Sequence, residues 1–554
     1  MSTPEASPEP VPGGADLARN TLVMAAGTLL SRLTGFLRVA ALSYAFGVTE
    51  SKLADAYNVA NVTPNIVYEL VLGGVLSSVL VPVFVETLRR DHEEHRHVVN
   101  AVTTVAGTVL VLISTVAIFA APLIARVLTL GAEGGGEEAV AMRQTVTLFL
   151  RLFLPQVLFY GLITIWTAYL NAHRHFGAPM FAPVLNNLVV AAVVLAFGFL
   201  VGFEPVDLET VATAPLLLVG VGTTLGIVAM TFPLWPVSRR HGWRWRPSLD
   251  WRHPMVRRVG RLGVWTVLYV VTNQIGYFVV VVLTGAMAVP GGFAAYTYAF
   301  VFFQLPHGIY AVSVMTALLP ALAAAASDDD LGTFRRELTR GVRVTALVIF
   351  PSGLGLAVLA TPIVRLLLEH GVFTASSTVL VSRTLTAFAL GLASFSLFQL
   401  FLRAFYALQD TRSPVLVNVG AVGVNILLDV VLFLLLPTEW KVPGLALGHA
   451  IAYTVGALLF AVLLRRRLRG LQGRETAGQL GRVVAAAALM SVVVWAVARA
   501  VASALGTATL AAQLATVAAS VFAGGSSYFA LATLFRVEDL ATLVRLIRRR
   551  LVPR

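Results

Sequence analysis

Residues 101–125 read AVTTVAGTVLVLISTVAIFAAPLIA and contain no charged side chain. As an α-helix this run would rise about 38 Å, which exceeds the roughly 30 Å of hydrocarbon in a bilayer. A helix can cross lipid because it satisfies its backbone hydrogen bonds internally. The stretch therefore predicts a transmembrane helix.

Similar apolar runs recur along the 554-residue chain, of which 57% is hydrophobic and only 12% is charged. A soluble domain has about 25% charged residues, so the composition predicts an all-α polytopic membrane protein without a large external catalytic domain. Hydropathy and turn residues predict fourteen helices. Their expected bounds are 20–46, 55–87, 98–129, 144–172, 179–202, 211–237, 256–287, 291–326, 338–368, 377–408, 413–436, 443–466, 480–505 and 508–535.

Basic residues concentrate in every second loop. Arginine-rich segments follow the second, sixth, eighth, twelfth and fourteenth predicted helices, whereas the alternate loops hold few cations and several acids. Because basic loops stay in the cytoplasm, both termini are predicted to be cytoplasmic. The net charge of +13 is then a signal of topology, and we expect no nucleic-acid partner.

The two halves of the chain share landmarks at a nearly constant offset. The pairs are Ala56-Tyr57 with Ala295-Tyr296, Pro82 with Pro320, Ala168 with Ala404, and Pro179 with Pro414. They predict a six-helix repeat whose two copies have the same orientation, with an axis along the membrane normal and a site between the lobes. The expected divisions are a disordered leader (1–19), a first lobe (20–237), a basic linker (238–255), a second lobe (256–466), a helix pair (480–535) and a basic tail (536–554). The tail would lie on the membrane as an amphipathic helix or extend into solvent.

Two arginines lie well inside the first predicted helix, Arg32 and Arg38. An arginine at the bilayer centre costs roughly 2.5 to 3.5 kcal/mol on insertion scales, so both should face water, an acid or an anionic ligand. One interpretation is a cationic cavity wall that binds phosphate through bidentate hydrogen bonds. The other is an internal ion pair, for which Glu69 in the second helix is the candidate partner of Arg32.

A polar stripe follows the second predicted helix. Its members recur at steps of three or four residues and share one helix face: Asp55, Asn58, Asn61, Asn65, Tyr68 and Glu69. Isolated asparagines would fit interhelical packing, but so long a run predicts contact with water or protein at mid-membrane depth. The facing wall is expected to carry Asn273, Gln274, Gln304 and His307, although His307 alone also fits a packing role.

In the eleventh predicted helix, Asn418, Asn425 and Asp429 share one face. Amide and carboxylate oxygens suit a small cation such as Na⁺, and a buried aspartate can instead take up a proton. Coupling to Na⁺ or H⁺ and plain structural hydrogen bonding both stay open, and no other cofactor is expected.

Catalytic signatures are missing from the sequence. The chain has no cysteine, which excludes disulfides, thiolate metal sites and thiol nucleophiles. It also has no glycine-rich phosphate loop, no metal-spaced histidine pair and no nucleophile elbow. We therefore expect a protein that is not an enzyme.

At these residues the sequence resembles the lipid II flippases called MurJ or MviN, within the multidrug/oligosaccharidyl-lipid/polysaccharide exporter superfamily. The shared motifs are Ser31–Arg38 (SRLTGFLR), Asp55-Ala56-Tyr57, Pro64-Asn65, Gly73-Gly74 through Val81–Phe84 (VPVF), Leu170–Ala172 with Ala182–Leu185, and, most specifically, Phe405–Pro414 (FYALQDTRSP). The resemblance implies fourteen helices in two lobes and a terminal helix pair that forms a groove for a lipid tail. It also implies outward movement of undecaprenyl-diphosphate-linked peptidoglycan precursor by alternating access.

The resemblance further implies roles for single residues. By motif position, Arg32, Arg38, Asp55 and Asn65 look like cavity residues, and Asn425 with Asp429 is similar to part of a sodium site. From their places in the helices, Tyr68 and Gln304 are added as candidate cavity positions next to Arg32, Arg38 and Asn65, and Asn61 and Glu69 are added to Asp55 as candidate gating or pairing positions. Tyr68 and Val301 stand where the family often has arginine, and Gln304 stands where it has an acid. Lys52 and Lys441 are the only lysines among 41 basic residues, which suggests a GC-rich genome and an actinobacterial-type branch.

We therefore expect a lipid II flippase of the bacterial inner membrane that serves peptidoglycan biosynthesis and cell shape. Its expected partners are lipid II, membrane lipids and, at the cytoplasmic loops, cell-wall synthesis proteins. Without an ATPase motif, the driving force would be the membrane potential or a coupled ion. Three alternatives stay open: a flippase for another undecaprenyl-linked glycan, a drug or cation antiporter of the same superfamily, and a non-transporting cell-wall scaffold.

Overall fold

The computed structural model describes residues 14–68, 80–130, 136–287, 290–470, 473–538 and 540. Within these ranges only the backbone is described for residues 14–22, 25, 67, 68, 90, 92, 258–269 and 474. The predicted leader lies mostly outside the described residues. The last residues of the predicted leader are described, because the first helix begins at Gly14 and not at the predicted Asn20. Backbone hydrogen bonds within a helix need no membrane, so the helix continues past its apolar part.

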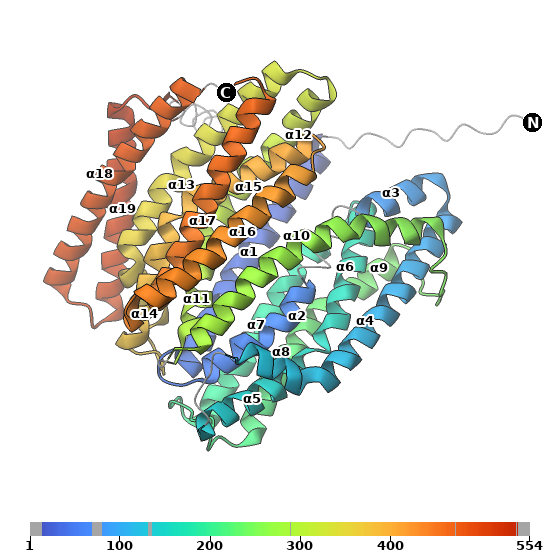
Figure 1. Cartoon of the computed structure of the whole chain (residues 1–554), viewed down its shortest axis with the longest axis horizontal. Coiled ribbons are helices and arrows are strands. Elements are labelled where there is room, and N and C mark those ends of the chain that lie inside the picture. Colours follow the sequence, from blue (N-terminus) through green and yellow to red (C-terminus); the bar gives the residue numbers. More distant parts are fainter. Residues whose placement is uncertain are drawn as a thin grey trace, which may run out of the picture.

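Every regular element in the described ranges is a helix (Figure 1). The helices are α1 (Gly14–Phe46), α2 (Leu53–Tyr68), α3 (Val81–Arg90), α4 (His92–Leu128), α5 (Glu137–Phe153), α6 (Gln156–Ala172), α7 (Gly177–Val201), α8 (Thr213–Thr231), α9 (Leu234–Arg240), α10 (Pro254–Gly285), α11 (Gly292–Pro306), the π-helix η2 (His307–Ala311), α12 (Val312–Ser327), α13 (Leu331–Leu368), α14 (Ala375–Leu390), α15 (Leu392–Ala407), α16 (Arg412–Leu435), α17 (Thr438–Arg467), α18 (Gly473–Leu505) and α19 (Leu510–Leu534). The prediction of an all-helical membrane protein is confirmed.

Ten helical stretches in the described ranges are long and apolar enough to cross a membrane, and the bent pair α14–α15 makes up to eleven. The predicted first, second and seventh helices do not qualify. The first contains Arg32 and Arg38, the second contains Asp55 and three asparagines, and only Val270–Gly285 of the seventh is an apolar helix. The two arginines lower the hydropathy of the first stretch, whereas the described part of the second (16 residues) and the apolar part of the seventh are too short to pass.

Several long helical stretches are interrupted at proline or glycine. Pro155 separates α5 from α6, Pro233 separates α8 from α9, and Gly391 lies at a 48° bend between α14 and α15. A π-helical turn directly follows Pro306. Proline lacks a backbone N–H and therefore breaks the helical hydrogen-bond ladder at such points.

The helices pack mainly in two groups (Figure 1). In the first helix group, α1 lies along α7, α7 along α8, and α2 against α5 and α6. In the second, α11 and α17 pack on α14, α16 packs on α17, and α10 lies along α16. Helices α18 and α19 pair with each other at one edge of the molecule and lie against α13.

The Phe405–Pro414 motif forms the turn between α15 and α16. Gln409 has a φ of +56°, and the Asp410 carboxylate accepts hydrogen bonds from the Arg412 amide (3.1 Å), from the Ser413 amide (3.0 Å) and from Arg467. Burial alone would raise the pKa of Asp410, but the hydrogen bonds of Ser413 and the charge of Arg467 hold it below its ordinary value. The motif thus caps α16, the helix that carries Asn425 and Asp429.

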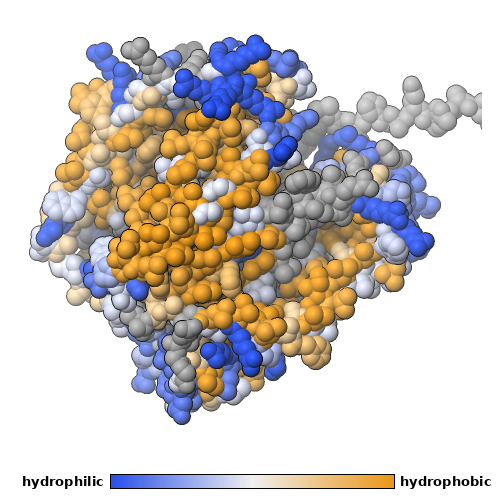
Figure 2. All heavy atoms as spheres, in the orientation of Figure 1, coloured by the Kyte–Doolittle hydropathy of each residue, from blue (hydrophilic) through white to orange (hydrophobic). Residues whose placement is uncertain are grey.

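The molecular surface has a broad apolar band with hydrophilic residues at its two ends (Figure 2). Large side chains on α4 contribute to the exposed apolar surface, among them Leu112 (64% exposed) and Phe119 (81% exposed). A surface this apolar is expected to face lipid.

Candidate functional site

An aspartate of the first helix group caps a helix of the second. Asp55, in the first turn of α2, accepts hydrogen bonds from the backbone amides of Gly291 (2.8 Å) and Ala294 (2.8 Å) at the start of α11. The first amides of a helix have no intrahelical acceptor, and a carboxylate there also complements the helix dipole. The Asp55 carboxylate therefore holds the two helix groups together at this end.

The same end contains a close backbone contact. Gly291 has a φ of +84°, and a Cβ built on it would lie 2.2 Å from the carbonyl oxygen of Val48. Gly371 has a φ of +64°, and its Cβ would lie 2.4 Å from the carbonyl oxygen of Tyr44. Only glycine allows the two segments to approach so closely.

A second carboxylate, Glu50, reaches the loop between α13 and α14. It accepts hydrogen bonds from the Ser377 hydroxyl (2.7 Å), the Thr374 amide (3.2 Å) and the Thr374 hydroxyl. The Val372 amide also donates to the Tyr44 carbonyl (2.9 Å). We call the contact of residues 44–55 with residues 291–294 and 371–377 the gate.

Hydrogen bonding keeps the Glu50 side chain ionised. Burial alone would raise the pKa of this carboxyl, but the hydrogen bonds from Thr374, from the Val48 amide and from Ser377 outweigh burial and lower the pKa below the ordinary 4.5. Glu50, Thr374 and Ser377 carry no distinctive signal in the sequence, because polar residues are ordinary in short loops and in the first turns of helices.

The two arginines of α1 lie farther from the gate. Arg32 is exposed, and its guanidinium lies against η2, where a Cβ built on Gly308 would be 3.2 Å from its Cζ. Arg38 is half-buried and lies within electrostatic range of Tyr298 in α11. Among the described residues no acid forms an ion pair with either arginine. The predicted partner Glu69 lies outside the described residues.

The residues of the polar stripe on α2 differ in exposure and in their hydrogen-bond partners. Asn58 is half-buried and donates to the Ala54 carbonyl (2.8 Å), Asn61 is buried, and Asn65 is exposed and accepts from the Tyr160 hydroxyl (3.4 Å). Tyr68 ends α2, but its side chain lies outside the described part. The structure therefore brings Asp55 to the gate and leaves Asn65 accessible.

Two residues of the predicted facing wall lie at the π-helical turn, which His307 begins and Gln304 precedes. His307 pairs through Nδ1 with the Ser396 hydroxyl (2.9 Å) and packs on the Phe395 ring at 4.8 Å, which agrees with a packing role. Gln304 is half-buried one turn earlier, and Asn273 and Gln274 of α10 are half-buried with bonding partners.

Unpartnered polar atoms gather in α16. Asp429 is fully buried, and within the described structure neither of its carboxylate oxygens has a hydrogen-bond partner. Both polar atoms of Asn418 and the Nδ2 atom of Asn425 are in the same state, while Gly448 of α17 lets the helices meet, because its Cβ would lie 2.5 Å from the Asp429 Oδ1. Burying an unpaired carboxylate is costly, so this chemistry fits a small cation or a proton. Among the described residues there is no cluster of three or more His, Asp or Glu residues that could hold a metal ion.

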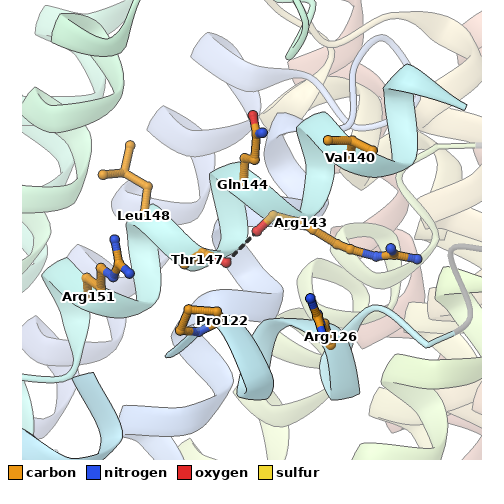
Figure 3. Close-up of a pocket in the computed structure, with 8 residues that line it drawn as sticks. All are labelled: Pro122, Arg126, Val140, Arg143, Gln144, Thr147, Leu148 and Arg151. Atoms are coloured by element: carbon orange, nitrogen blue, oxygen red, sulfur yellow. Dashed lines mark hydrogen bonds between the residues drawn. The ribbon is translucent and has the colours of Figure 1, made fainter. Parts of the chain in front are cut away.

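A separate cationic groove of about 520 Å³ lies between α4 and α5 (Figure 3). Arg126, Arg143 and Arg151 line it together with Gln144 and Thr147. None of the residues predicted for the cavity lines this groove.

Comparison with known proteins identifies the family. Residues 42–516 match the family model described as lipid II flippase MurJ. The chain belongs to the MurJ lipid II flippase family. A probable lipid II flippase MurJ of Rhizobium meliloti (strain 1021) is 32% identical over 486 residues, which are 86% of either chain. The lipid II flippase MurJ of Burkholderia cenocepacia is 30% identical over 82% of this chain and 84% of the relative.

Solved structures show the same fold. A structure titled lipid II flippase MurJ in an inward closed conformation has a TM-score of 0.75 at 22% identity and covers 94% of this chain and 100% of that one. A multidrug resistance MATE transporter in an inward-facing conformation has a TM-score of 0.63 at 14% identity, covering 80% and 94%. The resemblance seen in the sequence is confirmed: this MurJ family member is a multi-pass inner-membrane protein of a transporter family.

Proposed function

We propose that this protein moves lipid II, the undecaprenyl-diphosphate-linked peptidoglycan precursor, from the inner to the outer leaflet by alternating access. One observation carries the proposal beyond family membership. The two helix groups are hydrogen-bonded at the gate, while Arg32, deep in the same interface, is exposed without a described acidic partner. A closed end and a cationic interior are what an inward-facing carrier of a diphosphate needs.

The proposed topology has fourteen transmembrane helices in two six-helix lobes related by a parallel pseudo-two-fold axis, with both termini in the cytoplasm. Eleven of these spans are long and apolar enough to cross a membrane when the bent pair is counted as one. The three others would be α1, α2 with α3, and α10. Their polar residues would face the interior and not lipid. The arginine-rich loops support the cytoplasmic assignment.

Helices α18 and α19 would guide the lipid tail. A cavity of about 270 Å³ lies where α18 meets α13, α15 and α17, and its walls include Val342, Phe401 and Leu480. An apolar groove lets the long isoprenoid chain stay in hydrocarbon while the head group crosses.

The head group would enter from the cytoplasmic side, where the gate does not obstruct it. Moving an unsolvated diphosphate through hydrocarbon costs many kcal/mol. Arg32 and Arg38 would lower this cost by pairing with the phosphates in a water-filled cavity, and Asn65 and Gln304 would add hydrogen bonds. Opening the gate requires Asp55 and Glu50 to release the second helix group.

The chemistry of Asp429 and Asn425 supports coupling to Na⁺ or to a proton. A cation there would neutralise the buried carboxylate. Helix α16 also lies along α10, and α10 contacts α4 of the first helix group. The membrane potential would add about 2.3 kcal/mol per charge for each 100 mV.

A depletion experiment tests the proposed substrate. The host is depleted of the protein, and lipid II in the outer leaflet is assayed with an externally added toxin that cleaves it. We expect wild type and Arg143→Gln to restore cleavage, and Arg38→Gln to fail although it reaches the membrane. The Arg143→Gln substitution is the control, because it removes the same charge from a residue that lies in the α4–α5 groove (Figure 3).

Accessible lipid II that does not change on depletion would refute this substrate and favour another undecaprenyl-linked glycan. Rescue by Arg38→Gln, combined with failure of cytoplasmic-loop deletions, would favour the scaffold. A drug or cation antiporter shares the fold at 14% identity, but a cation exporter would need acids where Arg32 and Arg38 stand.

A further inference from the structure

A cavity of about 960 Å³ lies between α4, α6 and the segment that follows α9. Its walls carry four tryptophans and three arginines, together with apolar residues such as Val111 and Leu162. No residue of the gate, the α2 stripe or the Asp429 cluster lines it. The proposed transport function leaves this cavity unused.

The wall after α9 is held in place by hydrogen bonds. Gly242 turns the chain with a φ of +91°, and the next residues lie against α4, where the Arg246 amide donates to Asn100 (3.3 Å) and the Ser248 amide donates to Thr104 (3.1 Å). The Tyr169 hydroxyl of α6 donates to the His241 carbonyl (2.8 Å). This irregular segment is therefore a fixed wall of the cavity.

The cavity is positively charged and rich in hydrogen-bond donors. Among the described residues no carboxylate pairs with its arginines, Arg239, Arg244 and Arg246, and Arg239 stacks on Trp235 at 5.3 Å. The indole nitrogens of Trp166 and Trp243 are buried and find no acceptor in the described structure. These groups favour a ligand with negatively charged oxygens.

The cavity is also continuous with a lipid-facing surface. Beyond Val111, the face of α4 exposes Leu112 (64%) and Val116 (59%). Tryptophans concentrate where membrane proteins meet the head-group layer, and basic pockets between helices at that level bind anionic head groups. The volume lies in the range of small-molecule sites.

We propose that this cavity binds an anionic glycerophospholipid. The phosphate lies among Arg239, Arg244 and Arg246, the glycerol region lies on the tryptophan rings, and an acyl chain follows α4. The apolar wall disfavours a free phosphate ion, and the separation from Arg32 and Arg38 disfavours the transported substrate. The bound lipid joins α4 to the chain that leads into α10, the connection between the two helix groups.

Tryptophan fluorescence of the whole purified protein in nanodiscs tests the site without substitutions. Brominated phosphatidylglycerol quenches tryptophans that it contacts, and brominated phosphatidylcholine is the zwitterionic comparison. With a few mole per cent of either lipid, we expect at least twofold more quenching by phosphatidylglycerol. Equal quenching by the two lipids would overturn the proposal.

Two triple variants then locate the site by native mass spectrometry of retained lipids. We expect Arg239→Gln with Arg244→Gln and Arg246→Gln to lose one bound phosphatidylglycerol and at least tenfold in affinity. The matched control, Arg126→Gln with Arg143→Gln and Arg151→Gln, removes the same charge from the α4–α5 groove (Figure 3) and should keep that lipid. An equal loss in both variants, displacement by millimolar inorganic phosphate, or preferential displacement by undecaprenyl diphosphate would each overturn the proposal.

Discussion

At the scale of single residues, a few short side chains hold the gate closed. Thr49 and Ser376 come from different helix groups, and their hydroxyl oxygens lie 2.8 Å apart. The chain has no cysteine, so a pair of introduced cysteines is the only one that can react. These two positions therefore allow a direct test of whether transport requires the gate to open.

We expect Thr49→Cys with Ser376→Cys to form a disulfide under mild oxidation and to stop transport, with recovery on reduction. The geometry fits, because neighbouring hydroxyls indicate Cβ atoms close enough for a disulfide. The readout is lipid II accessibility in cells with and without oxidant. Each single cysteine variant is the control, and full transport by the oxidised pair would contradict a moving gate.

Glu50 gives the gate a defined pH dependence. Its pKa is below the ordinary 4.5 in the closed gate, so the carboxylate stabilises closure above the ordinary value, and this contribution disappears as the pH falls through the lowered pKa. We expect the contribution of Glu50 to gate closure to be complete from neutral pH down to its ordinary pKa of 4.5 and to be lost as the pH falls further. Spin labels at Glu137→Cys and Glu439→Cys, one on each helix group, report the separation. In Glu50→Gln the separation should change less with pH, and an identical profile would argue against Glu50.

At the scale of elements, the contact between the α1–α2 loop and the start of α11 depends on a glycine. Gly291→Ala places a Cβ 2.2 Å from the Val48 oxygen. We therefore expect the two sides of the gate to stay separated, and the distance between spin labels at Glu137→Cys and Glu439→Cys to increase. Gly506→Ala is the matched control, because its φ is also positive (+75°) and nothing lies within 4 Å of its Cβ. Both variants share a backbone penalty of about 1 kcal/mol. Equal distances in the two would show that the contact is not needed.

The cation proposal belongs to the pair α16–α17. We expect Asp429→Asn to remove any dependence of transport in proteoliposomes on a Na⁺ or proton gradient while leaving the fold intact, because the amide needs no countercharge. The Asn425→Ala variant should weaken the dependence without removing it. Gradient-dependent transport that persists in Asp429→Asn would assign coupling elsewhere.

At the scale of the whole molecule, the sequence predicted the helical class because apolar runs long enough to cross a membrane leave few alternatives. Arg32, Arg38 and Asp55 attracted notice because charge inside such runs is costly. Glu50 and its partners did not, since they lie in loops or in the first turn of a helix, and Thr49 meets Ser377 across 328 positions of the chain. The three tryptophans and four arginines between residues 235 and 246 looked like ordinary signals of topology. Only the structure joined the tryptophans and three of these arginines with Trp166 and α4 into one cavity.

The hydrogen bonds of the gate have a consequence for the free energy needed to open it. The groups that hydrogen-bond across it are carboxylates, hydroxyls and backbone amides, and water can hydrogen-bond to every one of them after separation. Buried apolar side chains of the same segments, such as Val48 and Phe373, add an apolar contribution to the contact. The net cost of exchanging such a bond for water is only about 0.5 to 1.5 kcal/mol, whereas an apolar plug would cost about 25 cal/mol for each Å² exposed. The hydrogen-bonded part of this seal can therefore close firmly and still be broken once in every cycle of the transport that we propose.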